Sequence, residues 1–358
     1  MKNILLINTL VFAFVASVFA DGHAAEIKAL QNQIDALASA VEGGSSSNGW
    51  WDKTSVGGYG ELHYNNTESS DKLDFHRFVL FVNHDFTDKI SLFTELELEH
   101  SLAGESFPGE VELEQAFVRF DLDNGLSADL GLFLMPIGIL NETHEPDTFY
   151  GVERNAVEKY IIPTTWWQGG AKVTKDLGNG VTVDFAVTDG LNTTDGYIRG
   201  ARQKVANAVA NDGAYTLRAV YNGIAGLQLG ATMFKQDDLS QGAGDQDATL
   251  TVLHAVYKKG GFGLKALTGE WDIDSTDAGI AKQDGFYIEP SYEFDTAYGK
   301  VGVFYRVAEY NYYKSGAQEK EDTTYGVNYW PTDNVVLKGD ITESNGSETL
   351  SLGVGYQF

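Results

Sequence analysis

The sequence predicts an all-β fold, a transmembrane antiparallel β-barrel of about 16 strands preceded by a short coiled-coil helix. The first reason is the stretch Thr349 to Phe358, where apolar side chains alternate with small or polar ones and the last residue is aromatic. The second is length, since about ten residues let a tilted strand cross a membrane. The third is that the alternation recurs upstream, in a chain with 40 Gly, 20 Phe, 18 Tyr and 6 Trp. A soluble sandwich strand alternates in the same way, and these features together favour the membrane.

Residues 1–20 have the pattern of a secretory signal peptide. Lys2 precedes an apolar run from Ile4 to Phe19, and cleavage is expected after the small residue Ala20. A membrane helix is the alternative, but the apolar run is short for a bilayer and polar residues follow it from Asp21. We therefore expect export.

Residues 21–42 form the predicted short helix. Five apolar residues occupy the a and d positions of its heptads: Ile27, Leu30, Ile34, Leu37 and Val41. Two heptads are too few for an independent coil, so the helix either oligomerises on a larger body or lies singly on the barrel rim. We favour the oligomerising coil.

Residues 43–53 form a linker before the barrel. Its first part, GGSSSNG, is flexible in composition. Trp50 and Trp51 follow, and they are suited to the membrane–water interface where the barrel begins.

Residues 54–358 contain sixteen alternating segments. Short turns are expected near Thr87, Asp123, Gly178, Gly223, Gly260, Ala297 and Pro331. Longer polar loops are expected at Asn65–Lys72, Ser101–Gly109, Pro136–Trp166, Asp189–Asp212, Gln236–Asp247, Asp272–Asp284, Asn311–Glu321 and Ser344–Ser347. This alternation of turns and loops fits an even-stranded barrel with both termini on the periplasmic side.

Each face of a strand can be assigned to lipid or to water from the free-energy cost of placing a charged side chain in lipid. In ISLFTELELEH, the charges of Glu95, Glu97 and Glu99 share one face. A charge facing lipid costs up to about 2–4 kcal/mol, too much for three glutamates in a fold with about 5–15 kcal/mol of stability, so they face water. The same reasoning places outward Ile90, Leu92, Leu96, Leu98, Leu126, Ala128, Leu130, Leu132, Leu134, Val181, Val183, Phe185, Val187, Val301, Val303, Tyr305, Val307, Val335, Leu337 and Ile341. It places inward Asp129, Asp184, Arg306, Lys338 and Asp340.

Three segments fit this scheme poorly. Thr249–Tyr257 has no clean alternation, and Pro290 would remove a ladder hydrogen bond unless it lies at a bulge. Glu112 and Glu114 fall on the face assigned outward, so we expect that strand to begin at Gln115.

Composition and motifs exclude several functions. The formal net charge of −26 argues against nucleic acid, and there is neither a Gly-x-Ser-x-Gly motif nor a phosphate-binding glycine loop. His144 and Glu145 are followed by Pro146 and by no second histidine, which rejects a zinc-protease motif. Two groups of loop acids have oxygen-ligand character but not the spacing of a calcium loop: Asp237, Asp238, Asp245 and Asp247, and Asp272, Asp274 and Asp277. We expect no cofactor, no metal and no catalytic step.

A barrel of about sixteen strands encloses an aqueous lumen, and the longest loop, Pro136–Trp166, is the candidate constriction. A loop of that length is uncommon unless it is functional, and it carries both charged and apolar residues. We expect it to fold into the barrel; an external cap on a neighbouring subunit is the alternative. The candidate pore-lining and constriction residues are Arg77, Glu95, Glu97, Glu99, Arg119, Asp129, Glu142, Glu145, Asp147, Glu153, Arg154, Arg218 and Arg306.

The order of several segments resembles the phosphate-selective porin O/P-like family of Gram-negative outer membrane porins. These segments are VGGYGEL, DFHRFVLFVNHDF, ELEQAFVRF, LGLFLMPIGI and the terminal GYQF. The resemblance implies a homotrimer of sixteen-stranded barrels in the outer membrane, in contact with lipids and lipopolysaccharide, with an inward-folded third loop and passive diffusion of small solutes or ions. It also implies that Phe358 is read by the barrel-assembly machinery.

Phosphate-selective members of that family carry a dense track of arginine and lysine. Here Arg77, Arg119, Arg218 and Arg306 are interrupted by the three glutamates of ISLFTELELEH, so phosphate is one possible solute among several. The alternative to a channel is a secreted or surface-attached β-rich adhesin or lectin, which would be soluble without detergent. An enzyme within a barrel comes third.

Overall fold

The computed structural model describes residues 49–358. The predicted signal peptide, the heptad helix and the first part of the linker lie outside the described residues. The end of the linker forms a short 3-10 helix, η2 (Trp50–Lys53), in which both tryptophans are exposed. Within residues 49–358 no helix has the length and apolar character needed to cross a membrane.

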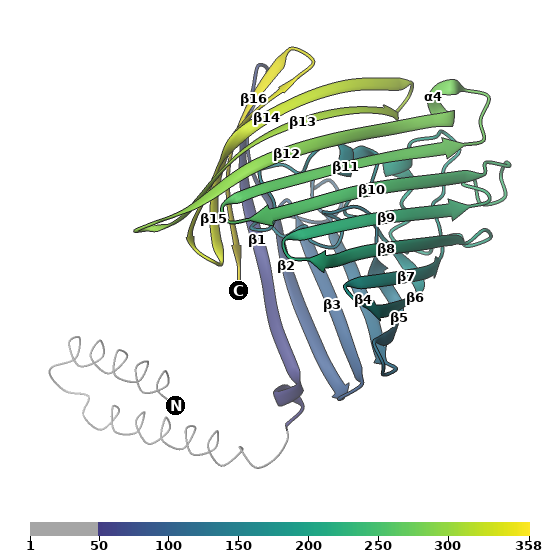
Figure 1. The fold of residues 1–358 in the computed structure, drawn as a ribbon. Coiled ribbons are helices and arrows are strands. Elements are labelled where there is room, and N and C mark those ends of the chain that lie inside the picture. Colours follow the sequence, from purple (N-terminus) through teal and green to yellow (C-terminus); the bar gives the residue numbers. More distant parts are fainter. Residues whose placement is uncertain (1–48) are drawn as a thin grey trace, which may run out of the picture. The chain divides into compact units, whose positions relative to one another are not determined.

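Sixteen strands form one closed antiparallel barrel, as predicted (Figure 1). Each strand pairs with its neighbours in sequence, and β16 pairs with β1. The strands are β1 (Thr54–Thr67), β2 (Asp71–Thr87), β3 (Ile90–Glu99), β4 (Val111–Asp121), β5 (Leu126–Leu134), β6 (Trp167–Gly178), β7 (Val181–Thr188), β8 (Ala214–Ile224), β9 (Leu227–Gln236), β10 (Ala248–Lys259), β11 (Phe262–Ile273), β12 (Lys282–Thr296), β13 (Gly299–Tyr313), β14 (Ala317–Thr332), β15 (Val335–Ser344) and β16 (Ser347–Gln357). Three short helices lie in the connections: α3 (Val157–Tyr160), η3 (Ile198–Ala201) and α4 (Ala278–Ala281).

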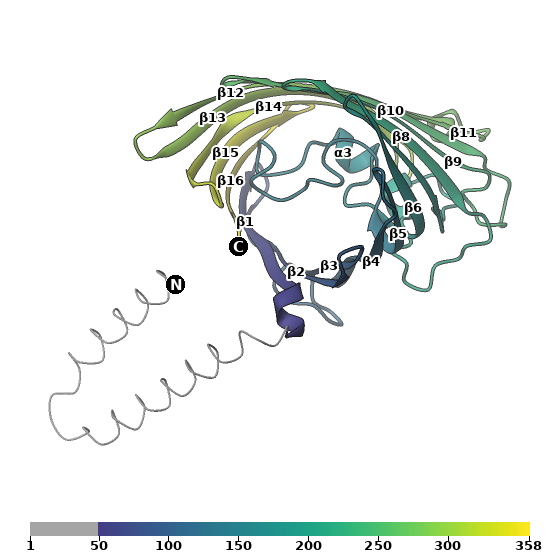
Figure 2. The ribbon, with the colours of Figure 1, turned by 60° about the horizontal axis from the view of Figure 1, so that its bottom comes forward.

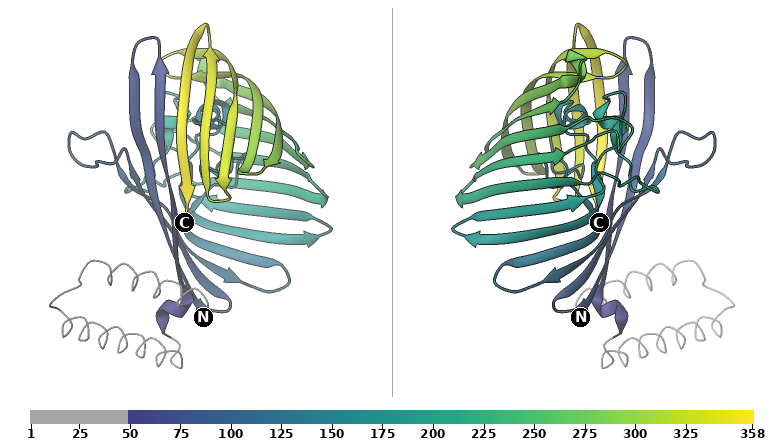
Figure 3. Two further views of the ribbon diagram at one scale, coloured as in Figure 1. Left: turned by 90° about the vertical axis from the view of Figure 1, so that its left-hand side faces the viewer. Right: turned by 90° about the vertical axis from the view of Figure 1, so that its right-hand side faces the viewer.

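The barrel closes through the chain end. Figure 3 shows the last strands, in yellow, beside the first, in purple. The Phe358 N–H donates to the Gly58 carbonyl at 2.9 Å, and the Gly58 N–H donates back at 3.0 Å. A side chain at Gly58 would place its Cβ 2.1 Å from the Val79 carbonyl oxygen, so this close approach requires glycine.

The seven predicted turns are present, and they gather at one end of the barrel, here called the turn end. The opposite end, which carries the longer connections, is called the loop end. Four of those connections are clearly shorter than predicted, because the flanks of Asn65–Lys72, Asp272–Asp284, Asn311–Glu321 and Ser344–Ser347 continue the strand pairing. The 311–321 loop, for example, reduces to residues 314–316.

The predicted faces are confirmed along most strands. Leu96, Leu130 and Leu352 point outward and are 43%, 48% and 48% exposed, whereas Glu95 and Asp129 point inward and are each 1% exposed. A belt of exposed apolar side chains around charged inner positions is the arrangement that a lipid environment stabilises.

Leu134 is an exception on the outer face, since it is buried. It pairs with Trp167 on β6, and the Lys204 ammonium lies 5.8 Å from the ring centroid of that tryptophan. Val205 lies close over Gly169 in the same region. The β7–β8 loop therefore covers Leu134. Strand alternation predicts that Leu134 faces outward, but it cannot predict that a distant loop covers it.

The predicted start of β4 at Gln115 is wrong. The strand begins at Val111 and contains a bulge, because Glu95 pairs with Gln115 while the next residue, Leu96, pairs with Leu113. The extra residue, Glu114, joins the inner face instead of lipid.

The two other irregular segments also have local explanations. On β10 the apolar residues Leu250 and Val252 point inward and are fully buried in a cluster inside the barrel. Near Pro290, the pairing of β12 with β13 is interrupted between Ile288 and Ser291 and resumes in the same register, so no bulge is present.

Candidate constriction in the barrel lumen

The β5–β6 loop, residues 135–166, lies inside the barrel, as expected. Figure 2 shows this loop and α3 within the ring of strands. Its apolar residues pack on the inner faces of β9 to β12 in one buried cluster, which includes Ile137, Val157, Ile161, Ile162, Trp166, Phe234, Leu250, Trp271 and Tyr287. Because the inner wall supplies these apolar partners, the loop docks there by burying apolar surface.

Glu158 of α3 is the polar centre of this docked segment. Its carboxylate accepts the N–H groups of Ile139 at 2.8 Å and Leu140 at 2.6 Å, and the Tyr287 hydroxyl at 2.7 Å. Burial raises the pKa of Glu158, while the two N–H groups and Tyr287 act in the opposite direction. Trp271 adds an indole N–H donated to the Ile161 carbonyl at 2.8 Å.

The tip of the loop, residues 149–152, is hydrogen-bonded to side chains of β13, β14 and β15. The Val152 N–H donates to Asp340 at 2.6 Å, and Lys338 donates to the Gly151 carbonyl at 2.9 Å. Further donors to loop carbonyls are Asn328 at 3.1 Å and Arg306 at 3.3 Å. All four wall side chains are less than a tenth exposed, so these contacts are shielded from water.

Histidines connect the loop to the wall formed by β1 to β4, which lies across the barrel from β9 to β12. His144 of the loop lies 3.4 Å from both Glu95 and Glu114, and Glu153 of the loop lies 3.1 Å from His63. Burial alone would lower the pKa of His144, but the Glu114 and Glu95 carboxylates raise it to about 10. A protonated His144 therefore joins the loop to two buried acids.

The wall arginines are each paired with carboxylates. Arg77 lies 2.5 Å from Glu61, and Arg306 lies 2.9 Å from Glu289. The remaining pairs are Arg119 with Asp129 at 2.7 Å, Arg218 with Asp184 at 2.7 Å, and Arg218 with Glu142. The inner wall thus presents neutralised pairs rather than a continuous basic track.

Three water-accessible spaces lie around the docked loop, one toward the loop end and two toward the turn end. The outer vestibule, toward the loop end, has a volume of about 710 Å³ and includes Glu153, Arg154 and Arg306 in its lining. Toward the turn end lie an inner cavity of about 530 Å³, lined in part by Glu142 and Arg218, and one of about 330 Å³, lined in part by Asp147. The loop therefore narrows the lumen between the outer vestibule and the water-accessible cavities near the turn end.

The structure brings the predicted site residues together only in part. Arg77, Glu95 and Glu97 are buried where loop and wall meet, while Arg119 and Asp129 pair on β4 and β5. Glu99 lies near Glu110 and Glu112 and is not among the wall residues that bind the tip of the loop. Glu145 is half-buried in the loop, and its carbonyl accepts from Thr148.

Several residues at the constriction were absent from the predicted set. Strand alternation already placed Lys338 and Asp340 inward, and it also applies to Lys172, which pairs with the inward Asp129. His144 and Glu114 carried no such signal, since their roles depend on contacts between distant segments and on a bulge. His63 shares the inner face of β1 with Glu61, but its contact with Glu153 of the loop joins distant segments.

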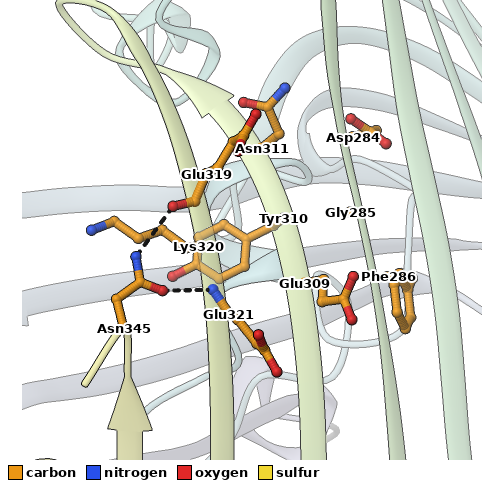
Figure 4. A pocket seen from close by; sticks show the side chains of 10 residues that line it. All are labelled: Asp284, Gly285, Phe286, Glu309, Tyr310, Asn311, Glu319, Lys320, Glu321 and Asn345. Carbon is orange, nitrogen blue, oxygen red and sulfur yellow. Dashed lines mark hydrogen bonds between the residues drawn. The ribbon is translucent and has the colours of Figure 1, made fainter. Parts of the chain in front are cut away.

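Outside the lumen, an acidic hollow of about 470 Å³ lies on β12 to β14 (Figure 4). The side chain of Asn345 bridges two neighbouring backbone groups there, since its amide donates to the Glu319 carbonyl and its oxygen accepts the Glu321 N–H. This contact fixes the β15–β16 turn against β14.

No protein-family model matches this chain. An uncharacterized protein of Aquifex aeolicus (strain VF5) is 27% identical over 326 residues, which cover 80% of this chain and 74% of that protein. Among solved structures, Salmonella typhi OmpF in complex with daunomycin has a TM-score of 0.62 at 14% identity, covering 85% of this chain and 97% of that one. The anion-selective porin from Comamonas acidovorans has a TM-score of 0.59 at 14% identity, covering 85% and 99%.

The trimer form of OmpT, an outer membrane protein of Vibrio cholerae, has a TM-score of 0.57 at 10% identity, covering 85% of this chain and 99% of that chain. At such low identities these likenesses show the fold alone. The chain shares the closed antiparallel β-barrel fold with these outer membrane proteins.

Proposed function

We propose that this protein is an outer membrane porin, a channel through which small hydrophilic solutes or ions diffuse passively. The observation that supports this best is the charged, wet lumen of a closed sixteen-stranded barrel, divided by an inward-folded loop. Such a lumen is wide enough to hold an aqueous path, and a loop within it sets the selectivity of that path.

The proposal includes export by a signal peptide and assembly in the outer membrane. The exposed apolar belt, with residues such as Leu352, suits contact with lipids and lipopolysaccharide.

A homotrimer is proposed because a trimer form occurs among the similar barrels. Phe358, which closes the barrel at β1, is the proposed signal for the barrel-assembly machinery. The proposed transport involves no catalytic step.

The proposed selectivity is set by the loop rather than by the paired wall arginines. Arg154 is the best placed cation, because it lines the outer vestibule and its guanidinium donates to Thr165 at 2.7 Å rather than to a carboxylate. Phosphate remains one possible anion, but a pathway of neutralised pairs favours small ions and solutes in general.

The test is conductance of the purified protein in planar bilayers. Discrete conductance steps are expected, and a folded, heat-modifiable protein that gives none would contradict a channel. In a salt gradient, Arg154→Gln should move the reversal potential toward cation preference, whereas Lys89→Gln, at an exposed turn, should not. Solubility without detergent would instead favour the adhesin.

A further inference from the structure

Three metal-ligating side chains meet where the outer vestibule borders β2 and β3. Asp74 and His76 belong to β2, and His100 directly follows β3. His100 Nδ1 lies 2.8 Å from Asp74 Oδ2, and His76 Nδ1 lies 3.3 Å from the same oxygen. The three side chains are 24–33% exposed, and all three line the vestibule. They are therefore accessible from water.

A bulge in β2 creates this cluster. Arg77 pairs with Glu61, but Phe75 pairs with Leu62, so His76 is an extra residue between them. In a regular strand His76 and Arg77 would face opposite sides, whereas the bulge turns both toward the lumen. His76 thereby joins Asp74 on the inner face.

The backbone then brings the second imidazole into place. His100 has φ of 51°, a conformation uncommon for a residue other than glycine. Its N–H donates to the His76 carbonyl at 3.1 Å, and the two imidazole centroids lie 5.6 Å apart. This local geometry directs both rings to the same carboxylate.

A supporting shell holds the cluster. The ring of His63 stacks on His76, with centroids 4.6 Å apart. The nitrogens of His63 are engaged by Glu61 at 3.0 Å and Glu153 at 3.1 Å, so His63 orients its neighbour rather than offering a ligand atom. Since Glu153 belongs to the docked loop, the cluster is also connected to the constriction.

We propose that Asp74, His76 and His100 form a site for a borderline divalent transition-metal ion such as Zn²⁺, Co²⁺ or Ni²⁺. Two imidazoles with one carboxylate suit these ions, whereas Ca²⁺ and Mg²⁺ prefer oxygen ligands. Bonds of about 2.0–2.2 Å place two ligands of a tetrahedral ion roughly 3.4 Å apart. The potential ligand atoms lie within 4.8 Å of one another, so modest side-chain rotations suffice.

Three protein ligands leave a coordination position open toward the vestibule, where water or a chelating solute can bind the ion. The vestibule already holds charges of both signs, including Lys72, Arg154, Asp322 and Asp340. A bound divalent ion adds positive charge at this mouth. This consequence rests on the proposed channel, whereas the metal site itself does not.

Two other groups of possible ligands in the described residues are less suited. Glu95, Glu114 and His144 are fully buried and anchor the loop. Near Glu110 and Glu112 the Lys204 ammonium already pairs with both carboxylates. Neither group opens onto the vestibule.

The test titrates the full mature chain, purified in detergent and stripped with a chelator, with Co²⁺ alone and then Zn²⁺. One Co²⁺ per chain should bind with visible d–d absorption, and Zn²⁺ should displace it. His76→Ala and His100→Ala should each lower the affinity by at least about 100-fold, since even loss of a supporting residue costs about 10- to 100-fold. His84→Ala, at the other end of β2, is the matched control and should bind normally.

Absence of Co²⁺ absorption, or binding that persists in both ligand variants, would overturn the proposal; heat-modifiable migration verifies that each variant is folded. Binding without conductance would contradict the channel but not the metal site. In bilayers, Zn²⁺ added at the loop end should shift the reversal potential toward anions in the wild type and not in His100→Ala. Binding without this shift would overturn the placement of the site on the solute path.

Discussion

Asp340→Ala should release the tip of the docked loop. Asp340 accepts the Val152 N–H at 2.6 Å, and the two residues are 5% and 0% exposed. A hydrogen bond to a charged group contributes about 1.5–3 kcal/mol. Its loss should raise the undocked population of the tip by about 12- to 140-fold, since about 1.4 kcal/mol corresponds to a factor of ten.

Single-channel recording in planar bilayers measures this change. Excursions to higher conductance should be more frequent in Asp340→Ala than in the wild type, with Asp340→Asn intermediate because its amide oxygen still accepts. Glu343→Ala removes a charge from an exposed position of the same strand and should leave the traces unchanged. Adding Lys338→Met removes a second anchor of the tip.

The reasoning is refuted if both Asp340→Ala and the double variant are folded barrels with wild-type traces. In that case the tip contacts do not control the width of the path, and the constriction lies elsewhere in the lumen.

Three further predictions concern the buried pairs, the loop histidine and the lipid-facing surface. Arg306→Met should lower the free energy of unfolding by about 3–5 kcal/mol in urea titration, because Glu289 would stay buried without its partner. His144 has a pKa raised from 6.5 to about 10, so its stabilisation is complete below pH 6.5 and is lost as the pH rises through about 10; conductance should become noisier over that interval. Leu352→Arg should weaken folding into lipid vesicles by about 2–4 kcal/mol if the residue lies near mid-membrane.

Each of these has its own control. Replacing Arg306 and Glu289 together by apolar residues should restore most of the stability, and a single variant as stable as the wild type would show that the pair is not effectively buried. His144→Asn should abolish the alkaline change, so a change that persists contradicts the assignment. Glu348→Arg, exposed near the loop end of β16, should cost much less than Leu352→Arg; equal losses would argue against a lipid-facing belt.

The strands, their number and the two faces of most of them followed from the amino-acid pattern. This was possible because side-chain direction in a strand has a period of two, so Ser351 and Leu352 face opposite sides wherever the strand lies. The apolar residues of the long loop also showed that it needs a partner surface, but a neighbouring subunit could have supplied that surface, so the sequence left the inward position open.

The residues that hold the loop, and the places where strands depart from their period of two, became apparent from the folded barrel. Asp340 and Val152 are separated by 188 positions, so no local pattern relates them. The bulges that turn His76 and Glu114 inward depend on the register with neighbouring strands. Alternation is a property of one strand, whereas register and docking are set by contacts between segments that the folded barrel alone brings together.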